Sequence, residues 1–162
     1  MNKYLSHIEI PKDSNIKYEY DHVNNKMMVD RFLNTSLNYP FNYGYFPDTL
    51  SGDGDPLDMM LITDHKLNSG VYINVKIIGA LLTKDEKGDD EKIICVPSDD
   101  VDINSININD LDDIDNHTLN KINFFFQNYK KIEKDKFTIV SNFVNKIDAI
   151  SIYNKSKDFY NK

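Results

Sequence analysis

Alternation of apolar and polar residues runs through the first two thirds of the chain and predicts β-strands. The predicted strands cover residues 16–21, 26–32, 59–63, 71–82, 92–96 and 136–140. Polar residues 22–26 between the first two strands predict a hairpin turn, and the charged stretch 84–92 predicts a polar loop. Short strands at even spacing are typical of a small closed barrel or a sandwich.

The period changes in the last third, where apolar residues recur every three or four positions from Thr118 onward. This spacing places them on one face of an α-helix. The residues concerned are Leu119, Ile122, Phe125, Phe126, Tyr129 and Ile132. A weaker pattern of the same kind predicts a second helix through Ile147, Ile150 and Tyr153. The pattern therefore predicts an α+β fold that is mainly β, in its simplest form a β-barrel with two C-terminal helices packed against it.

Size and composition favour one domain over residues 1–162, because 162 residues with 40% hydrophobic content can bury one sizeable core. The net charge of −7 and a single arginine, Arg31, argue against nucleic acid as a partner, since binding to a phosphate backbone depends on clustered Lys and Arg. No apolar run reaches the roughly 18 residues of a membrane span, and residues 1–12 lack the apolar core of a signal peptide. We therefore expect a cytoplasmic protein without membrane contact. The only cysteine, Cys95, lies in an apolar run and is expected to be buried and inert.

Three carboxylates, Asp53, Asp55 and Asp58, lie in the sequence DGDPLD directly before an apolar strand. Their mutual repulsion must be offset, and convergence on Mg²⁺ or Mn²⁺ would do so. A second acidic loop offers the carboxylates Asp85, Glu86, Asp89 and Asp90. Two such loops at strand ends could share several ions, and two metals about 3.5–4 Å apart are a common device for phosphoryl hydrolysis.

The acidic cluster allows other interpretations, which its residue spacing helps to test. One alternative that remains is a solvated turn without a metal, because Asp and Gly populate turns without any ligand. An EF-hand loop beginning at Asp53 would need Gly at its sixth position and Glu at its twelfth, where the chain has Asp58 and Asp64. A phosphotransfer aspartate would more usually follow a strand, whereas here the strand comes after the cluster. The histidines are too scattered along the chain to form a catalytic or metal-binding group; they are His7, His22, His65 and His117.

Polar and amphipathic side chains also alternate with strand residues in the N-terminal half. Lys17 and Glu19 share one face of a strand because they lie two residues apart. A cation beside an acid on one face suits a site that holds both phosphate and metal. Further groups of this kind are Arg31, Tyr39, Tyr43 and Tyr45, although such tyrosines often serve packing alone.

Seven motifs in the chain follow one another in the order and near the spacing of a known family. They are IEIP, IKYE, VDRF, YPFNYGY, DGDPLD, DEKGDDEK and FFFQNYKKIE. This series, from about Ile8 to the C-terminal helix, resembles the soluble family I inorganic pyrophosphatases of the short bacterial type, in which DGDPxD is diagnostic. The resemblance implies hydrolysis of pyrophosphate to two orthophosphates and a five-stranded OB-like β-barrel flanked by two C-terminal helices.

The resemblance also implies roles for individual residues. The implied metal ligands are Asp53, Asp58, Asp85 and Asp90, with Glu19 and Glu9 completing the acidic shell. Asp55 would orient or deprotonate the attacking water. The implied phosphate ligands are Lys17, Arg31, Tyr43, Lys92, Tyr129 and Lys130, with Tyr39 and Glu86 lining or supporting the cavity. The cofactor would be Mg²⁺, three to four ions per site, with Mn²⁺ or another divalent ion as the alternative, and the substrate would be pyrophosphate as its metal complex.

The resemblance implies direct attack by a metal-activated water, without a covalent phosphoenzyme. It also implies that the chain forms a homo-oligomer. Short bacterial members are commonly hexamers, but here Phe124, Asn128 and Lys131 occupy the places of two histidines and an aspartate at the contact between trimers. A hexamer is favoured and a trimer is the alternative. Two other functions stay open: a non-catalytic barrel that binds divalent cations or nucleotides, and an OB-fold nucleic-acid binder, which the charge balance opposes.

Overall fold

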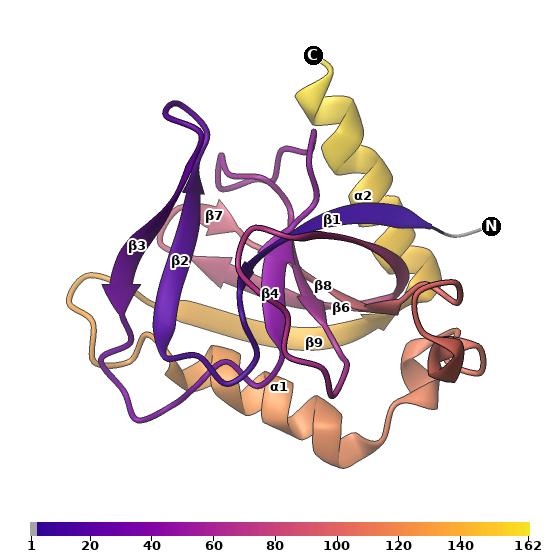
Figure 1. Cartoon of the computed structure of the whole chain (residues 1–162). Coiled ribbons are helices and arrows are strands. Elements are labelled where there is room, and N and C mark those ends of the chain that lie inside the picture. The colour runs from indigo at the N-terminus through magenta and orange to yellow at the C-terminus, as the bar shows by residue number, and fades with distance from the viewer. Residues whose placement is uncertain (1–2) are drawn as a thin grey trace.

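The computed structural model describes residues 3–162 and consists mainly of strands, with two long helices (Figure 1). The strands are β1 (Tyr4–Ile10), β2 (Ile16–Asp21), β3 (Lys26–Phe32), β4 (Asn42–Tyr45), β5 (Asp58–Leu61), β6 (Tyr72–Asp85), β7 (Gly88–Asp89), β8 (Lys92–Pro97) and β9 (Thr138–Asn145). The helices are α1 (Asn116–Asn128), α2 (Lys146–Tyr160) and two short 3₁₀ turns, η1 (Ile103–Ser105) and η2 (Leu111–Asp113). Neither long helix combines the length and the hydrophobicity that a membrane span requires.

Five strands close into a ring in the order β1, β4, β5, β8 and β6, because β6 also pairs with β1. All pairs in this ring are antiparallel except β5 with β8. The long strand β6 pairs with β1 near its start, while its C-terminal half carries β9 and β7. The hairpin of β2 and β3 stands beside the ring (Figure 1). The predicted five-stranded barrel with two helices is therefore confirmed, and a sandwich is excluded.

The ring strands bury side chains in two hydrophobic clusters, and each long helix contributes to a different one. Met59 of β5 and Ile93 of β8 belong to a cluster that includes Ala149 of α2. Their neighbours in sequence, Met60 and Ile94, belong to a second cluster. The second cluster also contains Ile122, Phe125 and Phe126 of α1. Cys95 is fully buried in the first cluster, as its apolar surroundings predict.

The structure corrects several predicted elements. Alternation does not reveal β1 and β4, because consecutive residues in both are buried. The predicted loop 84–92 contains the end of β6 and the short β7, and the last strand begins at Thr138 rather than at residue 136. Helix α1 ends at Asn128, so Ile132 lies outside it and is 69% exposed. Ile147 is also exposed, while Ile150 and Tyr153 pack against the core as predicted.

Candidate active site

A cavity of about 240 Å³ opens between the ring and the β2–β3 hairpin. All fifteen site residues predicted from the sequence line it, although they come from strands, loops and the end of α1. They are Glu9, Lys17, Glu19, Arg31, Tyr39, Tyr43, Asp53, Asp55, Asp58, Asp85, Glu86, Asp90, Lys92, Tyr129 and Lys130. The fold thus gathers these residues in one place, while their individual roles stay predictions.

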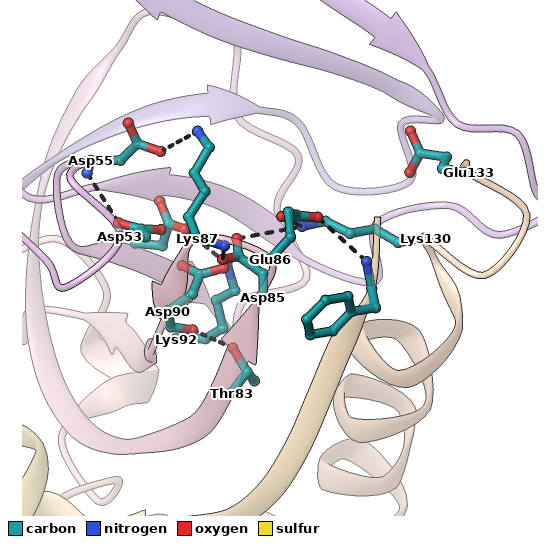
Figure 2. A network of polar contacts seen from close by, with 12 residues as sticks. Asp53, Asp55, Thr83, Asp85, Glu86, Lys87, Asp90, Lys92, Lys130 and Glu133 are labelled. Atoms are coloured by element: carbon teal, nitrogen blue, oxygen red, sulfur yellow. Dashed lines mark hydrogen bonds and ion pairs between the residues drawn. The ribbon is translucent and has the colours of Figure 1, made fainter. Parts of the chain in front are cut away.

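Three carboxylates in this cavity converge closely. One oxygen from each of Asp53, Asp85 and Asp90 lies within 4.8 Å of the others (Figure 2). Asp85 ends β6 and Asp90 precedes β8, so the tight β6–β7 hairpin brings them together. The Thr83 hydroxyl donates a hydrogen bond to the backbone carbonyl of Asp90 and holds the end of this hairpin. Hard oxygen ligands in such an arrangement fit Mg²⁺ or a similar divalent ion.

The charge of the converging carboxylates is costly without a cation. Burial raises the pKa of Asp53 to about 7, and the negative charges of Asp90 and Asp58 act in the same direction. The backbone N–H of Asp55 donates to Asp53 Oδ1 at 3.0 Å and partly opposes this shift. A divalent cation would stabilise the ionised carboxylates more strongly than this single N–H does.

Lys92 lies beneath the acidic group, at the start of β8, with only 2% of its surface exposed. Its Nζ lies 2.7 Å from Asp90 Oδ2, 2.8 Å from Asp58 Oδ2 and 2.7 Å from the Tyr43 hydroxyl. Burial opposes the charged amine, but the carboxylates of Asp58 and Asp90 outweigh it, so the pKa of Lys92 lies well above its ordinary value. Lys92 is therefore a permanently charged ammonium at the floor of the cavity.

The two carboxylates beside Lys92 respond differently to it. Burial raises the pKa of Asp58 to about 6, although Lys92 acts against the shift. Burial also acts to raise the pKa of Asp90, but the charge and hydrogen bond of Lys92 bring it below its ordinary value. Tyr43 also donates to Asp58 Oδ2, at 2.8 Å. Tyr43 and Lys92 thus both contact Oδ2 of Asp58, and the Asp58 carboxyl also shares a hydrogen bond with Asp90.

Two further lysines, Lys130 and Lys87, lie close to the acidic group. Lys130 Nζ lies 3.6 Å from Asp85 and 3.7 Å from Glu86 (Figure 2). Burial and the nearby Lys92 lower the pKa of Lys130, which the two carboxylates partly offset. Lys87, on the turn between β6 and β7, lies 3.4 Å from Asp55 Oδ2. The cavity therefore combines carboxylates that can hold metal with ammonium groups that can bind phosphate oxygens.

Several lining residues were missed at the sequence level. Asp30 and Lys87 carry charge into the cavity, and the rings of Tyr20 and His22 lie at its edge. Asp30 is an extra residue of a β-bulge, since Lys17 pairs with Arg31 and Tyr18 with Val29. Simple alternation along the strand would place Asp30 on the face opposite Arg31. The bulge changes the direction of the side chains, so alternation does not predict the position of Asp30. Lys87 could have been noted, because it lies inside the acidic loop itself.

Two of the four histidines, His7 and His22, lie close together in space. His7 and His22 each pack edge-on against Tyr20 and Tyr45, with ring centroids 5.0–5.4 Å apart. His7 Nδ1 lies 2.9 Å from the Tyr45 hydroxyl. Neither histidine belongs to the acidic group described above, which is the one possible metal-ligand group found within residues 3–162. Tyr129, predicted both as a core residue and as a phosphate ligand, is buried in the core and also lines the cavity.

Comparisons with known proteins agree with this geometry. A family model described as inorganic pyrophosphatase matches residues 6–161. The inorganic pyrophosphatase of Sulfolobus acidocaldarius is 51% identical over 134 residues, which are 83% of this chain and 78% of the relative. A solved inorganic pyrophosphatase from Helicobacter pylori superposes with a TM-score of 0.97 at 41% identity, covering 99% of this chain and 95% of that one. The structure from Thermus thermophilus gives a TM-score of 0.95 at 34% identity, covering 99% and 92%. The chain therefore belongs to the inorganic pyrophosphatase family.

Proposed function

We propose that the chain hydrolyses inorganic pyrophosphate to two orthophosphates with the help of divalent cations. The observation that carries this proposal is one cavity in which Asp53, Asp85 and Asp90 converge beside two buried lysines, Lys92 and Lys130. Such a cavity can hold hard cations and phosphate oxygens side by side. Membership of the inorganic pyrophosphatase family supports the same activity.

The proposed cofactor is Mg²⁺, three to four ions per site, with Mn²⁺ as the alternative. Asp53, Asp85 and Asp90 would form the centre of the ligand set, and Asp58 and Glu19 would extend it. Glu9 supports this set from β1. When bound, the cations lower the pKa of water and neutralise charge on the phosphates. With cations held by these residues, the negative charge of the carboxylates would be offset, so that an anionic substrate could approach.

Asp55 is proposed to orient the attacking water and to accept its proton. Its carboxylate lies beside the acidic group but outside the set of three oxygens that converge. A carboxylate that is not itself a metal ligand can accept a proton from water. The attack is direct, so no phosphate is transferred to the protein. Acid-quenched turnover of radiolabelled pyrophosphate should therefore leave the precipitated protein unlabelled, and a labelled protein would contradict this step.

The phosphate groups are proposed to lie against the cations of the chain and two tyrosines: Lys17, Arg31, Tyr43, Lys92, Tyr129 and Lys130. Lys92 already makes three contacts, one for each of its N–H groups. A phosphate oxygen must therefore replace one of these partners, for example Asp58 as it turns toward a cation. Tyr39 and Glu86 are proposed to shape the cavity around these groups.

Phosphate release from pyrophosphate tests the proposed function. We expect two phosphates per pyrophosphate with Mg²⁺ present, release at the background rate in excess EDTA, and recovery when Mg²⁺ is restored. Nucleoside triphosphates serve as comparison substrates. Absence of release with Mg²⁺ or Mn²⁺, together with saturable binding of either cation, would instead favour a non-catalytic binding barrel.

We also propose that the chain forms a homo-oligomer, with a hexamer favoured over a trimer. Phe124 on α1 is 56% exposed, which places a large apolar side chain on the surface of this helix. The Asn128 side chain donates a hydrogen bond to the backbone carbonyl of Phe124 at 2.8 Å, so the two residues lie next to each other on the helix. An apolar contact here would differ in chemistry from one made by histidines. Sedimentation at several protein concentrations distinguishes the monomer, trimer and hexamer.

A further inference from the structure

Arg31 reaches the cavity already paired with two carboxylates. Its Nη1 lies 2.6 Å from Asp30 Oδ2. Its other side meets Glu133, where Nε contacts one carboxylate oxygen and Nη2 lies 3.3 Å from the second. The hydrogen bond from Nη2 and the close ion pair at Nε both involve the carboxylate of Glu133, and together they favour one orientation of the guanidinium group, while Nε itself makes no hydrogen bond within residues 3–162. The orientation of Arg31 is therefore set largely by Glu133.

Glu133 is well placed to hold another residue in position. Its side chain is only 7% exposed. Its backbone N–H donates to the carbonyl of Lys130 at 3.0 Å, which ties it to the turn that follows α1. It is not one of the residues that line the cavity, and Figure 2 shows it apart from the carboxylates that converge there. Glu133 thus contacts Arg31 without belonging to the acidic group.

The hydrogen bonds of Arg31 leave room for one more partner. A guanidinium group has five N–H bonds. One on Nη1 donates to Asp30 and one on Nη2 donates to Glu133, while Nε lies against Glu133 without a hydrogen bond to it. Nη1 and Nη2 therefore each keep one further N–H, and two N–H groups are the number that a bidentate contact with a phosphate group requires. The β-bulge at Asp30 lets the aspartate and Arg31 both face the cavity, although they are adjacent in β3.

We infer that Glu133 is a positioning residue that holds the Arg31 guanidinium so that its remaining N–H groups face a phosphate of the substrate. The inference rests on the proposed hydrolysis of pyrophosphate. Without Glu133, the long Arg31 side chain would keep only its contact with Asp30 and would gain rotational freedom. Substrate binding would then have to order the guanidinium again, at a cost in affinity.

The variant Glu133→Gln tests the inference, because it keeps the size of the side chain and removes its charge. Asp135→Asn is the matched control, since it removes one charge from an exposed residue of the same turn. Asp135 has a φ of 61°, which asparagine tolerates. We expect Glu133→Gln to lower kcat/KM for magnesium pyrophosphate about tenfold, mainly through KM, and Asp135→Asn to change it less than twofold.

Two further measurements separate positioning from a general loss of structure. Mn²⁺ binding measured by calorimetry should be unchanged in Glu133→Gln, because Glu133 is remote from the carboxylates that converge. In an Arg31→Lys background, adding Glu133→Gln should lower kcat/KM less than twofold, because the residue that it positions is already altered. Full additivity of the two substitutions would overturn the inference, as would an unchanged KM for Glu133→Gln in an active enzyme. An inactive wild-type protein would instead overturn the proposed function, so the two failures are distinguishable.

Discussion

Asp55 is the residue to which the proposed mechanism assigns the proton of the attacking water. Asp55→Asn removes this proton acceptor while keeping the size and position of the side chain. We expect turnover to fall by about 10²–10⁴, the contribution typical of a general base, and Mn²⁺ affinity to change only slightly. Because the substitution also breaks the contact with Lys87, the control is Lys87→Gln, which removes the same exposed ion pair. Asp55→Asn with activity within about twofold of wild type would show that another group takes the proton.

Glu9 carries a prediction about pH. It accepts a hydrogen bond from the backbone N–H of Tyr20 at 2.8 Å, and burial raises its pKa to about 8. The folded protein therefore holds this proton more tightly than the unfolded chain does, so the free energy of unfolding falls as the pH rises from about 4.5 to 8. Glu9→Gln keeps an acceptor for Tyr20 and removes the charge.

We expect Glu9→Gln to be more stable than wild type by about 1–3 kcal/mol at pH 8 and nearly equal to it at pH 4. Urea unfolding in the presence of EDTA measures this without interference from cations. Parallel pH profiles for the two proteins would mean that Glu9 is already ionised in the folded state.

At the scale of elements, the β6–β7 hairpin determines how Asp85 and Asp90 meet. Gly88 in this hairpin has a φ of 132°, a conformation that side chains with a Cβ rarely adopt. Gly88→Ala should cost about 1–3 kcal/mol of stability and weaken Mn²⁺ binding at least tenfold, because relief of the strain moves the carboxylates apart. Gly70→Ala, at a φ of 94° outside the cavity lining, is the matched control. It should lose comparable stability and keep its Mn²⁺ affinity, as calorimetry on both variants can show.

The strands show why some elements could be predicted and others could not. The bounds predicted for β2 and β3 were correct, and neither strand of this hairpin contains a fully buried residue. All of β4 and the last five residues of β1 are buried on both faces and lack an alternating pattern. Ile132 continued the helical spacing by coincidence, since α1 already ends at Asn128. The periodicity of apolar residues therefore revealed the partly exposed strands β2 and β3 and missed the largely buried strands β1 and β4.

The sequence predicted those residues of the candidate site that belong to recognisable motifs. All residues named from those motifs line the cavity. Asp30 and Glu133 were not predicted, because one depends on a bulge and the other on a contact between residues 102 positions apart in the chain. Residues that orient others are fixed by tertiary packing and carry no local signal of their own.

At the scale of the whole molecule, bound cations should raise stability. A ligand at one hundred times its Kd contributes about 2.7 kcal/mol at a single site, which corresponds to roughly 5–10 °C in Tm for a chain of this size. We expect Mg²⁺ to raise the Tm by this amount, because it removes repulsion among Asp53, Asp85 and Asp90. NaCl at matched ionic strength controls for screening. An equal rise in Asp53→Asn would indicate that the stabilising ions bind elsewhere.

Closure of the ring by pairing of β1 with β6 has a consequence for the order of folding. The strands that meet there are Tyr4–Ile10 and Tyr72–Asp85, and the cavity also needs Lys130, which follows α1. Contacts so distant in sequence form late, because a long loop must close first. In stopped-flow refolding, helical ellipticity should therefore recover before Mn²⁺ binding does. Cation binding would then report that folding is complete, and the ions would play no part in starting it.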